Sequence, residues 1–363
     1  MRYVRWTGLV LASLLACPAL ATADNGSFKQ HYQAYQQALS QRDLPLALQE
    51  LEQAYALAKQ IYAPDSEDFA NLTLSLANHR LRDDKIPRQD IYPLYSQALS
   101  SLEKLHGPAN AALLDPLLGA AKTAEDHHAK LSLLERAIDI AEQQQNPALL
   151  AEVQLEAYEV ASNTFYYGRK HLGWLKQAHA YASSPANRDA NLTLRTTFHL
   201  GNALMGSNEL RKSAELLTTV VDQTKALNFS HPYALASHAR LVNIYERLGK
   251  SEQATPHCIA LGSMKPWDDN QEQAPLFRVE PKYPLREAER GVMGYAVLSF
   301  TINTSGAVQN VEVLETGGAK SFGEESAKAL AKWRFAPKFV DGKAVTASSK
   351  VRIDFALQGR TMR

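Results

Sequence analysis

The residues of this chain that most often do chemistry form no catalytic or metal-binding pattern. His127 and His128 are adjacent, and neighbouring residues of a helix point to different sides. The acidic pairs Asp268-Asp269 and Glu324-Glu325 have no apolar surroundings that would raise a carboxyl pKa. The sequence also lacks the H-E-x-x-H, C-x-x-C, Walker and G-x-S-x-G motifs. We therefore predict no enzyme activity, no metal site and no cofactor.

The first 23 residues have the pattern of a secretory signal peptide. Arg2 and Arg5 precede an apolar stretch from Thr7 to Leu20, and Ala21-Thr22-Ala23 is a small-residue cleavage site. The apolar stretch is shorter than the roughly 20 residues that a membrane-spanning helix needs. We therefore expect an exported chain that begins at Asp24.

The same segment allows two other outcomes. Leu14-Leu15-Ala16-Cys17 resembles a lipobox, and lipidation of Cys17 would hold the protein at a membrane. Pro18 and the competing site at Ala23 weigh against that outcome, and an uncleaved anchor is the third. Once the signal is removed, Cys258 is the single cysteine and can form no internal disulfide. Its apolar neighbours predict a buried thiol.

Residues 24–262 show the periodicity of paired amphipathic helices. Apolar residues recur at helical spacing, as in Leu131, Leu134 and Ile138, and strand-like alternation is absent. Helix breakers recur about every 40 residues; they include Pro64, Pro108, Pro147, Pro185 and Pro232. Leu200-Gly201-Asn202-Ala203 and the segment around Tyr245 resemble tetratricopeptide (TPR) repeats. We predict an all-α, TPR-like solenoid of about five helix pairs.

A solenoid of this kind offers an extended concave face that binds peptides or proteins. The alternative is that the helices only separate the C-terminal part from another element. Residues 266–275 are polar and bounded by Pro266 and Pro275, which predicts an exposed linker over 263–277, with Trp267 packing back on the last helix.

After this linker the periodicity changes from 3.6 to 2 residues. Ala296 to Ile302 alternates as a strand, Gly306 ends a turn, and a second strand runs over 308–315. Ser321 and Glu324 have the spacing of a capping box, which predicts a helix to about Lys332. A long alternating strand runs from Val345 to Phe355. The order strand, strand, helix, strand predicts a small α+β domain.

The C-terminal part resembles the TonB C-terminal domain over residues 278–358. The resemblance is carried by Tyr283-Pro284, the spaced glycines and Trp333-Arg334-Phe335. The expected organisation is a signal peptide (1–23), a TPR-like helical domain (24–262), a linker (263–277), a TonB C-terminal domain (278–358) and a tail (359–363).

The resemblance implies that this domain binds the TonB box, an extended segment of TonB-dependent outer-membrane receptors, by β-augmentation. It places Glu280, Pro281, Lys282, Tyr283 and Pro284 beside the docking edge, and the strand from Val345 to Phe355, with Lys350 and Arg352, at that edge. It assigns the structural core of the domain to Gly291, Gly294, Gly306, Phe322, Trp333 and Phe335.

Several of these residues have a second interpretation. The rings of Tyr283, Trp333 and Phe335 are typical of core packing, and Lys350 and Arg352 are typical of a protected sheet edge. Glu280 stands where the best-known family members carry glutamine, which alters the expected preference for the box.

The resemblance implies a periplasmic protein of energy-coupled transport, such as iron-chelate uptake. The chain has no histidine between Met1 and Leu20 and no Pro-rich spacer, so an adaptor fits better than a direct transducer. The helical repeats would bind a partner protein, for which a TonB-system component is one candidate. A periplasmic scaffolding protein with protein or peptidoglycan contacts is the alternative. The net charge of +1 gives no argument for nucleic acid.

Overall fold

A computed structural model of the chain describes residues 22–357 except 228–229, 265–266 and 269–270. The expected signal peptide therefore lies outside the described residues except for its last two positions, and so do Cys17, Asp269 and the tail at 359–363. The described residues divide between Trp174 and Leu175 into two compact units, which are presented separately.

The first unit is helical. Its elements are α1 (Thr22–Gln41), α2 (Leu44–Ile61), α3 (Glu67–Arg80), α4 (Arg88–His106), the 3₁₀ turn η1 (Ala111–Leu113), α5 (Leu114–Thr123), α6 (His127–Gln143), α7 (Pro147–Ala161) and the start of α8 (Arg169–Ala182). Helix starts are fixed by side chains that accept backbone N–H groups, among them Ser66, Asp126 and Asn146. The buried faces are built from alanine and leucine, as in Leu117, Leu134 and Ala137.

The second unit begins with the rest of α8. Four further helices follow: α9 (Ala190–Gly206), α10 (Leu210–Thr224), α11 (Pro232–Arg247) and α12 (Ser251–Met264). Gly201 lets α9 approach α10 closely, since a Cβ at this position would lie 3.0 Å from Leu217. The described residues up to Met264 thus contain twelve α-helices, or six pairs, where the breaker spacing predicts about five.

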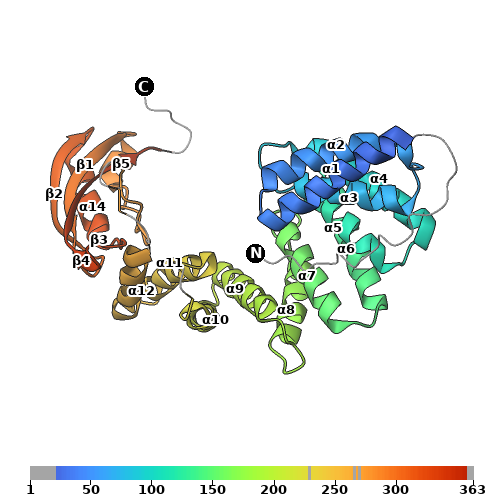
Figure 1. The fold of residues 1–363 in the computed structure, drawn as a ribbon. Helices are drawn as coiled ribbons and strands as arrows, with labels where there is room; N and C mark the ends of the chain where they lie inside the picture. The colour runs from blue at the N-terminus through green and yellow to red at the C-terminus, as the bar shows by residue number, and fades with distance from the viewer. Residues whose placement is uncertain (1–21, 228–229, 265–266, 269–270, 358–363) are drawn as a thin grey trace. The chain divides into compact units, whose positions relative to one another are not determined.

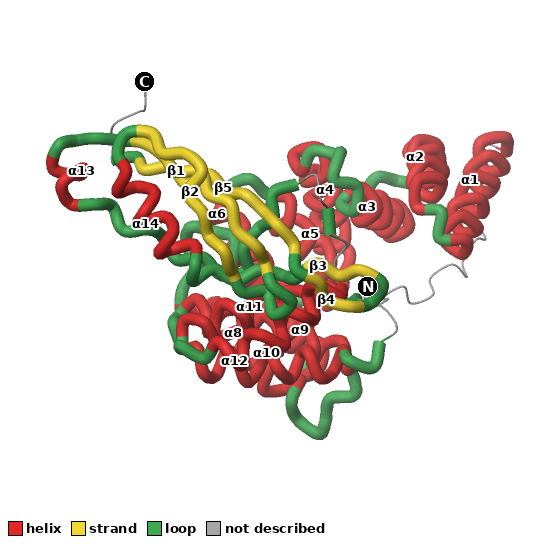
Figure 2. The backbone as a smooth tube through the Cα atoms, turned by 90° about the vertical axis from the view of Figure 1, so that its left-hand side faces the viewer, coloured by secondary structure: helices red, strands yellow, loops and turns green. Residues whose placement is uncertain are grey.

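The C-terminal part of this unit is a small α+β domain (Figures 1 and 2). Its elements are α13 (Leu285–Glu289), β1 (Gly294–Ile302), β2 (Val308–Gly317), α14 (Lys320–Leu330), β3 (Lys338–Val340), β4 (Lys343–Val345) and β5 (Ala347–Phe355). The antiparallel sheet has the order β2-β1-β5, and β3 and β4 form a separate hairpin. Alternate residues of β1 are buried beneath α14, in a core that includes Leu298, Phe300, Phe322 and Trp333.

Two local predictions about this domain are wrong. The helix does not begin with a capping box at Ser321. It begins at Lys320 after Ala319, with no side-chain cap, because the positive φ of Gly318 turns the chain into the helix directly. The last strand does not begin at Val345 either. Asp341 and Gly342 both have positive φ and form a tight hairpin turn, so Val345 pairs with Lys338 in β4.

The described residues between the helices and the sheet make contacts that a plain exposed linker would not make. Trp267 packs against the core of the C-terminal domain. Leu276 and Phe277 pack against Cys258 and Leu261 of α12. The buried thiol predicted for Cys258 is confirmed.

Candidate partner-binding edge

β5 is the regular edge of the three-stranded sheet. One side of its backbone pairs with β1 along its whole length, from Gly294 opposite Phe355 to Ile302 opposite Ala347. No strand of the described residues pairs with its other side. The opposite edge, β2, has two register shifts and a positive φ at Asn310, features that disfavour pairing with another strand. β5 is therefore the edge better suited to accept an added strand.

The two faces of β5 differ in character. Val351, Ile353 and Phe355 are buried in the core, whereas Ser348, Lys350, Arg352 and Asp354 are exposed. The Arg352 side chain is already engaged, because its Nε lies 2.9 Å from the Asp354 carboxylate and its guanidinium lies 3.7 Å from the centre of the Tyr295 ring. Lys350 has no ion pair with any described residue.

The segment Glu280–Pro284 lies near the end of β5 and is held by its aromatic ring. The Tyr283 hydroxyl donates to the carbonyl of Val292 at 2.7 Å, and its ring packs edge-on against Phe322 and Phe355. Burial raises the pKa of Tyr283. Tyr283 thus packs on the core and joins this segment to β5, while Lys282 and Glu280 are exposed.

Glu280 forms a small surface network. Arg278 pairs with Glu280 at 2.9 Å, and its guanidinium stacks 4.9 Å from the centre of the Trp333 ring. The Trp333 Nε1 donates to the carbonyl of Val279 at 2.8 Å. The charge at Glu280 is therefore partly neutralised within the chain. Pro281 and Pro284 are half-buried.

The remaining predicted residues shape the domain. Phe322, Trp333 and Phe335 are buried. Gly291 and Gly306 have positive φ, and a Cβ at Gly294 would collide with the Gly317 carbonyl on the neighbouring strand. Val345 lies in β4, away from the edge that the sequence assigned to it.

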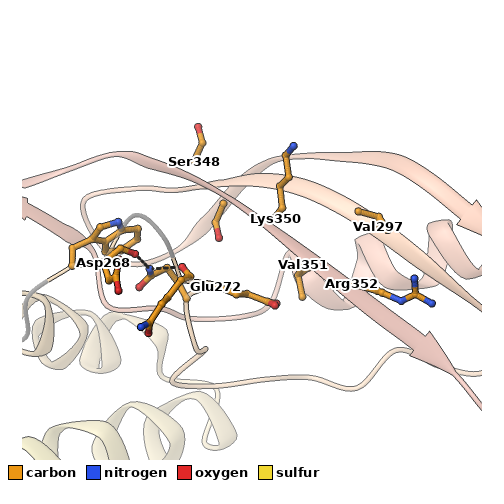
Figure 3. A pocket seen from close by; sticks show the side chains of 11 residues that line it. Asp268, Glu272, Val297, Ser348, Lys350, Val351 and Arg352 are labelled. Atoms are coloured by element: carbon orange, nitrogen blue, oxygen red, sulfur yellow. Dashed lines mark hydrogen bonds between the residues drawn. The ribbon is translucent and has the colours of Figure 1, made fainter.

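Sequence reasoning missed a cavity beside β5. It has a volume of about 440 Å³ and lies between β5 and the residues that precede the domain (Figure 3). The lining comprises Ser348 to Arg352 of β5, Val297 of β1, and five residues of the preceding segment. We call these five residues the acidic turn; they are Trp267, Asp268, Gln271, Glu272 and Gln273. The prolines and acidic residues of this segment were visible in the sequence, but they indicated only a linker.

Sequence reasoning also missed a buried ion pair that joins the domain to the helices of the same unit. Arg334 Nε lies 3.2 Å from Glu246 Oε1, and the two side chains are only 10% and 9% exposed. Arg334 also donates to Thr255 Oγ1 at 2.6 Å. We call these three residues the Arg334 joint. Its arginine stood in the Trp-Arg-Phe motif, but nothing in the sequence identified Glu246 as its partner.

Two histidines meet close to this joint. His238 on α11 and His257 on α12 bring their Nδ1 atoms within 2.8 Å, and the His257 ring stacks on Tyr245. Burial lowers the pKa of His238. Burial, together with the neighbouring His238, lowers the pKa of His257 to about 4. Both rings are thus held neutral at pH 7.

The described part of the chain contains no group of three or more His, Cys, Asp or Glu residues placed to hold a metal ion. None of its helices is long and apolar enough to cross a membrane. The arrangement at β5 is suited to binding an extended polypeptide through backbone hydrogen bonds and exposed charges.

Comparison with known proteins supports the reading of the C-terminal part. The family model of the Gram-negative bacterial TonB protein C-terminal matches residues 279–357. Protein TonB of Pseudomonas aeruginosa is 34% identical over 86 residues, which is 24% of this chain and 25% of that protein. Protein TonB of Vibrio cholerae is 26% identical over 82 residues, 23% of this chain and 34% of that protein. The chain thus matches only a quarter to a third of the length of these relatives.

Solved structures match the two parts of the chain separately. The solution structure of the Pseudomonas aeruginosa TonB C-terminal domain is 31% identical, and the match covers 26% of this chain and 94% of that one, with a TM-score of 0.23. The N-terminal region is similar to TPR-like repeats assigned to a kinesin light chain of Podospora anserina. That match has 17% identity, covers 65% of this chain and 93% of that one, and has a TM-score of 0.28.

Proposed function

Residues 279–357 are a TonB C-terminal domain, and we propose that it binds the TonB box of an outer-membrane receptor by adding the box as a strand to β5. The observation that carries the proposal is the free backbone edge of β5, nine residues long and regular throughout its pairing with β1. Each backbone hydrogen bond contributes about 1 kcal/mol net, so a few of them give a reversible grip.

The side chains around this edge suit the same task. Lys350 stands on the exposed face without an ion pair among the described residues, so it is available to a receptor segment. Lys282 and Glu280 lie on the exposed segment that Tyr283 holds near Phe355, at the end of β5. A box strand that runs past the end of β5 would meet this segment.

We propose that the protein acts as a periplasmic adaptor in TonB-dependent uptake, of the iron-chelate type. The C-terminal domain would hold the receptor, and the helical repeats would bind a second protein. This role is one of binding and not of catalysis. The Arg334 joint supports it, because a load on β5 would pass through a buried ion pair into α11 and α12.

The test is a titration of the isotopically labelled full chain with seven-residue TonB-box peptides, followed by NMR. We expect amide shifts that are largest over Ser348 to Asp354 and small over β2. A scrambled peptide of the same composition is the control, because it keeps the charge and loses the order. Shifts confined to β2 or to the helices, or no shifts with any box peptide, would sink the proposal.

A further inference from the structure

The free edge of β5 is one wall of a groove and not an open surface. Five consecutive strand residues, Ser348 to Arg352, line the cavity of about 440 Å³. Successive side chains of a strand point to opposite faces, so a cavity that touches all five follows the backbone itself. The other side of that backbone is occupied by β1. The cavity therefore runs along the free edge, where an added strand would be placed, and extends to Val297 of β1, opposite Arg352.

The acidic turn forms the facing wall and is held in place. The Gln273 side-chain amide donates to the carbonyls of Asp268 at 2.8 Å and Gln271 at 3.0 Å, as the dashed lines of Figure 3 show. Trp267, at the start of the turn, packs against the core of the C-terminal domain. The wall is thus tied to the same domain that carries β5.

The two walls carry opposite charges. Asp268 and Glu272 stand on the turn, and Lys350 and Arg352 stand on the strand. Arg352 is paired with Asp354, whereas neither Glu272 nor Lys350 has an ion pair with a described residue. A strand lying in the groove has one edge on β5 and its other edge toward the turn. That second edge presents backbone N–H groups to the turn, and the side chains on one face of the added strand lie within reach of the two carboxylates.

We propose that the acidic turn is a specificity wall, and that through Glu272 it selects extended peptide segments that carry a basic residue on the face turned toward the acidic turn. The inference rests on the proposed function, because it takes β5 as the edge that receives the peptide. It adds a recognition element from outside the residues that match the TonB C-terminal family, which begin at Val279.

The probes are three forms of one seven-residue TonB-box peptide, with Gln, Lys or Glu at a single position, scanned over the alternate positions of the peptide. The protein is the full chain with wild-type sequence, Glu272→Lys or Glu324→Lys. Glu324 is an exposed glutamate of α14, so its substitution makes the same change of charge away from the groove. Affinity is measured by titration calorimetry and the site of binding by NMR.

At one position we expect the Lys peptide to bind wild-type protein roughly threefold more tightly than the Gln peptide, as for an exposed ion pair. Glu272→Lys should abolish this preference, and Glu324→Lys should retain it. The amides of Gln271, Glu272 and Gln273 and the Trp267 indole should shift together with β5.

Three results would overturn the inference while leaving the proposed function intact. They are shifts at β5 with an unchanged turn, equal affinities for the Lys and Gln peptides at every position, and a preference that survives Glu272→Lys. Absence of any shift at β5 would overturn the proposed function and this inference together.

Discussion

The β5 edge and the Arg334 joint both place charged residues on one small domain, and they use charge in opposite ways. At β5, Lys350 is exposed and has no ion pair with a described residue. At the joint, Arg334 and Glu246 are about nine-tenths buried and depend on each other. An exposed charge adds little to stability and is free to recognise a partner. A buried pair holds its two groups in one geometry, and removal of either member leaves a buried charge that destabilises the fold.

The largest change in stability is expected from a substitution in the Arg334 joint. Glu246→Gln leaves the Arg334 guanidinium buried without its countercharge, which should destabilise the second unit by about 3 kcal/mol. The measurement is denaturant unfolding of the full chain, followed by tryptophan fluorescence. Glu280→Gln is the matched control, because its pair with Arg278 is exposed. Equal losses in the two variants would show that burial does not distinguish these pairs.

A second test concerns the packing at the joint. Gly306 has φ of +78°, and a Cβ there would collide with the Phe335 carbonyl and lie 3.0 Å from Cys258 on α12. Gly306→Ala should therefore cost about 2 kcal/mol or more, from backbone strain together with this collision. Gly342→Ala is the control, because φ is +74° but the space around it is open, so strain alone should cost about 1 kcal/mol.

The histidine pair beside the joint predicts a pH dependence. The folded-state pKa of His257 is about 4, below its ordinary value of 6.5, so between these values the unfolded chain binds a proton that the folded chain does not. Stability should fall as pH drops from 6.5 to 4, by about 2 kcal/mol once partial exposure of the ring is allowed for. Unfolding of wild type and His257→Gln across this range is the measurement. If the stability of the two proteins changed with pH in the same way, the pH dependence would not come from His257.

The success of sequence reasoning also differed between the two regions. The sequence predicted β1 and β5 from their alternation, because a period of two indicates a strand with one buried face. The family motif located Tyr283 and Trp333, whose rings meet the same core. Patterns of this kind depend only on residues close together in the sequence. They therefore predicted the order of strand, strand, helix and strand in the domain.

Contacts between distant segments could not be predicted from the sequence. Arg334 and Glu246 are 88 positions apart by their numbering, and nothing near either residue indicates the other. The acidic turn was taken for a linker because its composition is that of one, although Trp267 packs on the core. The pairing of Val345 with Lys338 depends on positive φ at both Asp341 and Gly342, which the alternation from Val345 to Phe355 does not show.

The smallest change in stability is expected from a substitution on β5. Lys350→Glu should leave stability within about 0.5 kcal/mol of wild type, because the side chain is exposed and has no ion pair among the described residues. Its affinity for a TonB-box peptide with an acidic residue should fall about fivefold, the range of one exposed charge pair. Lys343→Glu on β4 makes the same change of charge away from the groove and should alter neither quantity. If Lys350→Glu lowered stability as much as Glu246→Gln does, the charge on β5 would be part of the fold, and the edge would not be a surface kept for recognition.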